Sequence, residues 1–308
     1  MLTRRELLAS LSSLAAFGCS RPDKSIPQIA APSTPPLASA PPPAAASRLL
    51  EWDLAGPVGP GKAAIIVPAN APPAARFPVV IALHGRGESL KSPADGAMGW
   101  PRDYALLRAI DRVSAPPLVD DDFEGFSDPA RLAQINQDLS VKPYPGLIIA
   151  CPYIPDYATG AVDLRTVSHF LIDVLLPRVR SETPALATPE ATGIDGVSMG
   201  GLLALRVGLK NPQIFGAVGS EQAAITQGDK YEFTELAKAA RARRPGLRLR
   251  LLTSYEDPYR SANEHLSASW NAAGIAHDYA DVPGPHDYVF NRGPGSIELL
   301  TWNARALT

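Results

Sequence analysis

The chain has 308 residues, of which 45% are hydrophobic and 19% are charged, a balance that supplies a sizeable core and is typical of a globular protein. Its formal net charge of −2 gives no electrostatic reason to expect nucleic acid or an anionic membrane surface as a partner. Beyond the N-terminus, no segment is apolar for long enough to span a membrane.

The N-terminus predicts export from a bacterial cell. Arg4 and Arg5 precede an apolar run at 7–18, and Cys19 follows that run. The paired arginines resemble a twin-arginine signal, and the run is too short to be a transmembrane helix. Residues 1–19 are therefore expected to direct the protein to the periplasm or out of the cell. Cys19 is a candidate for lipidation, which would be the only membrane attachment; the alternative is an unprocessed amphipathic first helix.

A Pro-, Ala- and Ser-rich stretch at 20–47 predicts an extended tether, because it cannot bury enough apolar surface to fold. The folded domain is expected at 48–308. Short apolar runs there predict strands, and amphipathic periodicity predicts helices. In chain order we expect strands at 63–67, 78–83, 146–150, 194–197, 215–219, 247–252 and 277–282, and helices at 102–113, 129–139, 162–176, 199–209, 231–244, 263–273 and 296–307.

Strands that alternate with helices predict an α/β class with a mainly parallel central sheet and helices on both of its faces. The segment 88–128 carries loop signals. We expect it to form a flap beside the functional groups, which in such sheets collect beyond the carboxyl ends of the strands.

The pentapeptide Gly-Val-Ser-Met-Gly at 196–200 fits the pattern G-x-S-x-G of a nucleophile elbow. A serine on a sharp strand-to-helix turn has strained backbone angles, and side chains at the two glycine positions would collide with neighbouring elements. A predicted strand precedes the motif and a predicted helix follows it. We therefore expect Ser198 to be a nucleophile, although the same motif also fits a plain small-residue turn.

A serine hydroxyl needs a base that is held by a carboxylate. Of the five histidines, His286 follows Ser198 in the chain and lies in the loop after the predicted strand 277–282. The acid is expected in the loop after the preceding strand, where Glu256 and Asp257 are the candidates. We favour Asp257, which could otherwise cap the following helix.

The reaction also needs backbone N–H groups that hold an oxyanion. Met199, directly after the nucleophile, is the first candidate. The second is expected in the His-Gly-Arg-Gly loop after strand 78–83, where Arg86 is favoured and Gly85 and Gly87 remain alternatives that also allow close approach of the substrate. His84 is expected to be structural.

The run from 196 to 218 resembles the putative-esterase (esterase D-like) family, which includes feruloyl esterases, enterochelin-esterase-like enzymes and mycolyltransferases. The Leu-His-Gly motif, the Asp257 loop and the Gly-Pro-His loop extend the resemblance over most of the chain from about residue 60. It implies an α/β-hydrolase fold and ester hydrolysis by Ser198, Asp257 and His286. One departure is Glu221, where many members have a small residue, and we expect this side chain to alter the substrate pocket.

The sequence thus predicts a serine esterase that needs no metal or organic cofactor and acts on a small-molecule or polymer-borne ester. A peptidase or an acyltransferase with the same triad remains an alternative. So does a surface-binding protein that kept the fold and lost the activity.

Overall fold

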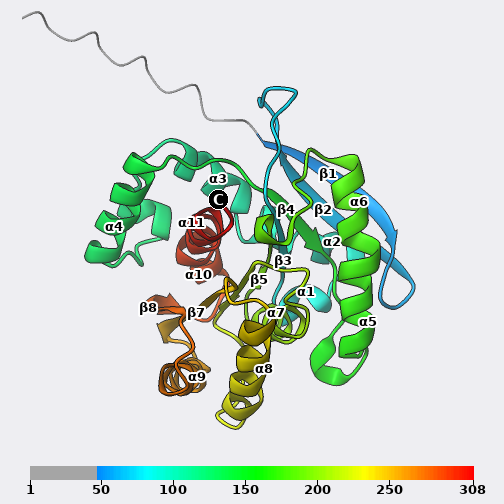
Figure 1. The fold of residues 1–308 in the computed structure, drawn as a ribbon. Helices are drawn as coiled ribbons and strands as arrows, with labels where there is room; N and C mark the ends of the chain where they lie inside the picture. The colour runs from blue at the N-terminus through cyan, green and yellow to red at the C-terminus, as the bar shows by residue number, and fades with distance from the viewer. Residues whose placement is uncertain (1–46) are drawn as a thin grey trace, which may run out of the picture. The chain divides into compact units, whose positions relative to one another are not determined.

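The computed structural model describes residues 47–308, and the predicted export signal, the lipidation candidate Cys19 and most of the tether lie outside them. The described chain builds one eight-stranded sheet in the order β1-β2-β4-β3-β5-β6-β7-β8 (Figure 1). The antiparallel hairpin β1–β2 forms one edge, and β2 is antiparallel to β4. All pairs from β4 to β8 are parallel. The strands are β1 Ser47–Ala55, β2 Pro60–Pro68, β3 Val79–Leu83, β4 Ile148–Pro152, β5 Thr192–Gly196, β6 Ala217–Glu221, β7 Arg248–Glu256 and β8 Asp278–Pro285.

The central parallel strands are buried throughout, as short runs such as Val-Val-Ile-Ala-Leu in β3 predict. Successive side chains of a strand point to opposite faces of the sheet. Ile81 accordingly belongs to one core cluster and Val80 to the other. The sheet therefore needs helices on both faces.

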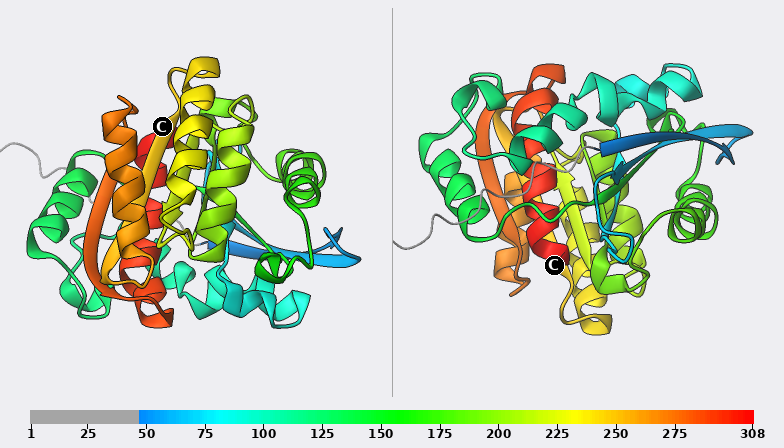
Figure 2. Two further views of the ribbon diagram at one scale, coloured as in Figure 1. Left: turned by 90° about the horizontal axis from the view of Figure 1, so that it is seen from below. Right: turned by 90° about the horizontal axis from the view of Figure 1, so that it is seen from above.

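One face is covered by helices that pack Phe170, Leu203 and Phe233 against it. The left view of Figure 2 shows α7, α8 and α9 side by side in front of the strands. Helices α5 and α6 are joined by a π-helical segment at 170–175 and follow one another without a break. The helices of this face are α5 Leu164–His169, α6 Leu176–Glu182, α7 Met199–Lys210, α8 Asp229–Arg243 and α9 Arg260–Ala272.

The opposite face is covered by α3 Leu106–Ser114, α4 Pro129–Val141 and the C-terminal helix α11 Ser296–Leu307, which runs along the strands in the right view of Figure 2. Leu106, Ile135 and Leu300 from these helices join one core cluster with Val80. The α/β class and its mainly parallel sheet, covered on both faces, are thus confirmed.

The structure differs from the expectations mainly at 88–128. This segment is not a flap of loops: it forms α1 Arg86–Ser89, α2 Pro93–Ala97, a π-helical turn at 99–103, α3 and a short 3-10 helix at 120–123. Trp100 and Tyr104 are 0% and 1% exposed, so this part of the segment belongs to the core. The predicted helix at 102–113 begins only at Leu106, because Ala105 has a left-handed backbone with φ of 53°.

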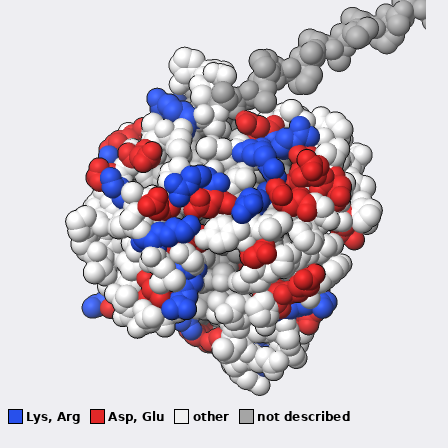
Figure 3. Space-filling view, turned by 180° about the vertical axis from the view of Figure 1, so that it is seen from behind, with Lys and Arg blue, Asp and Glu red and all other residues white. Residues whose placement is uncertain are grey.

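Two further features concern membrane-spanning helices and the charges on the surface. Within residues 47–308, no helix combines the length and the apolar character needed to cross a membrane. On the face shown in Figure 3, acidic and basic side chains lie next to one another in mixed clusters rather than in a large patch of one sign.

Candidate active site

Ser198 occupies the sharp turn between β5 and α7. Its φ of 58° and ψ of −117° are unusual for a residue with a side chain and indicate a strained backbone. A Cβ at Gly200 would lie 2.3 Å from the main-chain oxygen of Leu83, so that position admits no side chain. The Ser198 N–H donates to the main-chain oxygen of Glu221 at 2.9 Å. The turn is thus fixed on both sides, and its geometry is the one expected of a nucleophile elbow.

His286 lies directly after β8, and its ring is between Ser198 and Asp257. Nε2 is 3.0 Å from Ser198 Oγ, and Nδ1 is 2.9 Å from Asp257 Oδ1. A carboxylate can only accept, so Nδ1–H donates to Asp257 and leaves Nε2 free to accept the serine proton. The ring of Tyr259 packs edge-on against the imidazole, with centroids 5.3 Å apart. The structure therefore brings together three side chains that are far apart in the sequence.

The Asp257 carboxylate is fully buried, and both of its oxygens accept hydrogen bonds. Besides His286, it accepts from Thr253 Oγ1 at 2.7 Å and from the N–H of Tyr259 at 2.9 Å. Glu256, the alternative acid, is exposed. Geometry therefore favours Asp257, whose orientation is set by two donors besides the histidine.

The loop after β3 lies against the nucleophile. A Cβ on Gly85 would lie 3.7 Å from the Cβ of Ser198. The N–H of Gly85 is already used, because it donates to Tyr104 Oη at 3.1 Å. In contrast, the N–H groups of Arg86, Gly87 and Met199 donate to no atom of residues 47–308. Met199 and either Arg86 or Gly87 are therefore the candidates for holding an oxyanion, and we continue to favour Arg86.

The side chain of Arg86 forms an ion pair that is separate from its main-chain N–H. Its guanidinium binds both carboxylate oxygens of Asp156, at 3.1 and 3.0 Å from Nε. This hydrogen bond is the main cause that raises the pKa of Arg86. The pair links the loop after β3 to the loop after β4. Gly87 adjoins the histidine loop, since a Cβ there would lie 3.1 Å from Tyr288 Oη.

His84 is buried and holds two loops together. Its Nδ1–H donates to the main-chain oxygen of Gly85 at 2.8 Å, and its Nε2 accepts the N–H of Ile154 at 3.0 Å. Burial lowers the pKa of this imidazole, which favours the neutral form that both bonds require. Neither bond leads to the Ser198 hydroxyl, in keeping with a structural role.

The expectation that Glu221 alters the substrate pocket needs correction. Its side chain is 0% exposed and points into the protein, where Oε1 accepts from Arg250 at 2.8 Å. Arg250 also donates to Asp195 at 2.9 Å and to the main-chain oxygen of Glu298 at 2.9 Å. Burial raises the pKa of Glu221 well above its usual range. Glu221 therefore belongs to a buried ionic cluster beneath the elbow.

Sequence reasoning missed Gln222. This buried residue follows β6, has a φ of 45°, and donates from Nε2 to Ser254 Oγ at 2.6 Å and to the main-chain oxygen of Pro285 at 2.8 Å. It thus holds the residue directly before His286. Its place beyond the carboxyl end of a parallel strand was the one available signal.

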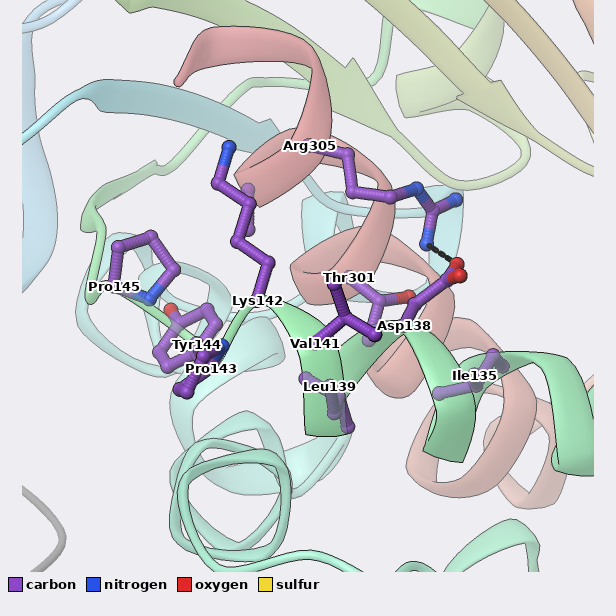
Figure 4. A pocket seen from close by; sticks show the side chains of 11 residues that line it. Ile135, Asp138, Leu139, Val141, Lys142, Pro143, Tyr144, Pro145, Thr301 and Arg305 are labelled. Atoms are coloured by element: carbon purple, nitrogen blue, oxygen red, sulfur yellow. Dashed lines mark hydrogen bonds and ion pairs between the residues drawn. The ribbon is translucent and has the colours of Figure 1, made fainter. Parts of the chain in front are cut away.

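A separate cavity of about 210 Å³ lies between the end of α4, the segment 142–145 and α11 (Figure 4). Arg305 and Asp138 form an ion pair at its rim, and Leu139 is among its apolar walls. None of the three triad candidates lines it. Among residues 47–308, no three His, Cys, Asp or Glu side chains are grouped so that they could hold a metal ion.

Residues 153–289 match the model of the family described as "Putative esterase". Similar solved structures include a ferulic acid esterase, with a TM-score of 0.63 and 14% identity over 85% of this chain and 99% of that chain. An S-formylglutathione hydrolase from Staphylococcus aureus has a TM-score of 0.62 and 13% identity over 84% and 99%. A ferulic acid esterase from the anaerobic fungus Anaeromyces mucronatus has a TM-score of 0.55 and 18% identity over 85% and 92%.

At these identities the similarity to solved structures shows the fold alone. No curated protein sequence matches the chain. The family match adds the class of chemistry, because it spans Ser198, Asp257 and His286. The chain therefore has an α/β-hydrolase fold, its residues 153–289 are similar to the putative esterase family, and its enzyme class is that of the carboxylic ester hydrolases.

Proposed function

We propose that this enzyme cleaves carboxylic esters through an acyl-enzyme formed on Ser198, with His286 as general base and Asp257 as the acid that orients it. The observation that carries the proposal is the chain of two hydrogen bonds from Ser198 Oγ through the His286 ring to Asp257, at 3.0 and 2.9 Å. A serine with this arrangement can lose its proton as it attacks.

In the first half of the reaction, Ser198 Oγ attacks the ester carbonyl carbon while His286 Nε2 takes the hydroxyl proton. The negative charge on the carbonyl oxygen is held by the N–H groups of Arg86 and Met199, which have no other acceptor among residues 47–308. The bond to the alcohol oxygen then breaks, and the alcohol leaves with the proton from His286.

In the second half, His286 takes a proton from water as the water oxygen attacks the acyl carbon. The bond to Ser198 breaks, the serine regains its proton from His286, and the carboxylic acid leaves. The Asp257 carboxylate keeps Nδ1–H toward itself throughout, so that Nε2 faces the serine and the water in turn.

Labelling with a fluorophosphonate probe tests the proposal, because such a probe reacts only with an activated serine. The wild-type protein should be labelled and should hydrolyse small aryl esters, whereas Ser198→Ala should do neither and should still unfold at the wild-type temperature. The control is Ser140→Ala at an exposed serine of α4, which should behave as wild type. Hydrolysis that survives in Ser198→Ala would refute the proposed nucleophile.

The natural substrate is proposed only as a class, a small-molecule or polymer-borne ester. A panel of acetyl, longer acyl and feruloyl esters, together with an acyl thioester, samples what the names of the similar structures suggest. Peptide and alcohol acceptors in the same assay would reveal a peptidase or an acyltransferase.

We also propose that the protein is exported and that Cys19 is a lipidation site. The proposal rests on the sequence Arg4, Arg5, apolar run, Cys19. Replacing both arginines with lysine should leave the protein in the cytoplasmic fraction. Cys19→Ser should release an exported protein from the membrane fraction if the cysteine is lipidated.

A further inference from the structure

Glu88 lies in α1, where the loop after β3 meets the loop that carries His286, and it is 1% exposed. Its Oε1 accepts a hydrogen bond from Tyr288 Oη at 2.6 Å, and its Oε2 accepts one from Tyr104 Oη. Lys91 Nζ is 3.4 Å from Oε1. A buried carboxylate is costly without such partners, so this arrangement calls for an explanation.

Tyr104 links Glu88 to the oxyanion loop. Its hydroxyl gives its proton to Glu88 and accepts the N–H of Gly85 at 3.1 Å. Burial, and next the neighbouring Glu88, raise the pKa of Tyr104 well above its usual range, so the phenol keeps the proton that it donates. The Gly85 peptide is thereby fixed, and so is the start of the next peptide, whose N–H belongs to Arg86.

Tyr288 links Glu88 to the histidine loop. It is two residues after His286, and its ring packs edge-on against that of Tyr104 with centroids 5.6 Å apart. Burial, and next the hydrogen bond to Glu88, raise the pKa of Tyr288, so this phenol is also a donor. Pro285 is held from the other side by Gln222. The histidine is therefore bracketed by two hydrogen-bonded anchors.

We propose that Glu88 is a positioning residue that aligns the oxyanion donors with the His286 loop by binding Tyr104 and Tyr288 at the same time. This inference rests on the proposed function, because it assigns the two loops their catalytic tasks. Glu88 acts through its neighbours and touches neither Ser198 nor His286. Its loss should therefore lower the rate of the chemical step rather than weaken substrate binding.

A carboxylate suits this position because it accepts on both oxygens and donates on neither. Gln at 88 has nearly the same shape but would present an N–H₂ group to one of the two phenols. That phenol would then lose its acceptor or turn its hydroxyl around. For Tyr104, a turned hydroxyl would point its proton toward the N–H of Gly85. The substitution should thus disturb the loops while leaving the volume of the core unchanged.

The test compares Glu88→Gln, Tyr288→Phe and the double variant. Glu88→Gln should lower kcat by about ten- to a hundred-fold, slow fluorophosphonate labelling in parallel and change KM by less than about threefold. Tyr288→Phe should lower kcat by a smaller factor. The double variant should be no slower than Glu88→Gln alone, since both changes remove the same link.

The matched control is Tyr153→Phe, which also removes a hydroxyl bonded to α1, through the main-chain oxygen of Ser89 at 3.0 Å, but has no bond to Glu88. It should keep the wild-type kcat. If Glu88→Gln fails to fold, the comparison of Tyr288→Phe with Tyr153→Phe still tests the inference. An unchanged kcat in Tyr288→Phe, or an equal loss in Tyr153→Phe, would overturn the inference.

The two proposals fail separately. If Ser198→Ala keeps its activity, the proposed function is wrong and the loops have no catalytic task to align. If Ser198→Ala is inactive while Glu88→Gln matches the wild type in kcat and labelling rate, the function stands and Glu88 is merely structural.

Discussion

The side-chain amide of Gln222 donates to the main-chain oxygen of Pro285, 2.8 Å away, and so ties the end of β6 to the residue directly before His286. The same nitrogen donates to Ser254 Oγ on β7 at 2.6 Å. One side chain thus joins three neighbouring strand ends. The backbone of Gln222 has a φ of 45°, which is strained for a residue with a side chain, and it lies next to the proposed triad.

Replacing Gln222 with Met should leave the oxygen of Pro285 without its donor at nearly constant volume. We expect kcat to fall by about tenfold, because the histidine loop loses an anchor. The free energy of unfolding should fall by about 1–3 kcal/mol, the usual penalty for unpaired buried polar groups. Ester kinetics and urea unfolding measure the two effects, with the exposed Gln213→Met as control. A loss of stability without a loss of kcat would limit Gln222 to a structural role.

Asp257→Asn should separate the two candidate acids. An amide can present its N–H₂ group to His286 and so favour the wrong tautomer, and kcat should fall by roughly three to four orders of magnitude. Glu256→Gln changes the exposed neighbour, and its kcat should be within about twofold of the wild-type value. The comparison needs only ester kinetics at one pH. Loss of activity in Glu256→Gln with a normal Asp257→Asn would reverse the assignment.

Gly200→Ala should be strongly destabilising. The added Cβ would lie 2.3 Å from the main-chain oxygen of Leu83 and 2.6 Å from that of His84, and neither backbone atom can move freely. We expect a loss of about 3 kcal/mol or more in the free energy of unfolding. Gly246→Ala is the control, because its Cβ would meet nothing within 4 Å. Thermal or urea unfolding of the two variants should differ clearly, and equal stability would contradict the tight packing of the elbow.

Glu221→Gln should change how stability depends on pH. Burial raises the pKa of Glu221 in the folded protein above the value of about 4.3 in the unfolded chain. Between the two values the folded state binds more protons, so the free energy of unfolding falls as pH rises through this window. Gln at this position does not titrate, so the stability of the variant relative to wild type should increase as pH rises above about 4.3, the pKa of the glutamate in the unfolded chain. The exposed Glu51→Gln is the control, and a difference that does not grow with pH would count against a raised pKa.

The sequence predicts the middle of this fold better than its edges. All-apolar strands such as β3 are recognised because both faces of a central parallel strand are buried. Strand β1 was not predicted, since only Trp52 of its nine residues is buried and its pattern alternates poorly. The start of the helix expected at 102–113 was wrong for a different reason: Ala105 has a left-handed backbone, which no pattern in this part of the sequence signals.

The same contrast holds for the candidate site. Ser198, Asp257 and His286 could be proposed because each follows a predicted strand, and parallel strands end at one edge of the sheet. Glu221 was misjudged because successive side chains at a strand end point to opposite sides, and the sequence does not say which side faces the site. Glu88 could not be found, since its importance lies in a contact with Tyr288, which is distant in the chain. Gln222 does follow a strand, but its contact with the distant Pro285 cannot be read from the sequence.

Arg86 places its two polar groups in different surroundings: the main-chain N–H has no acceptor among residues 47–308, and the guanidinium binds Asp156. An amide hydrogen is present whichever amino acid occupies position 86, proline excepted. Substitution at this position can therefore change the side chain beside the proposed active site while the proposed oxyanion donor is retained. A saturation library at position 86 is for this reason a sound starting point for directed evolution of selectivity.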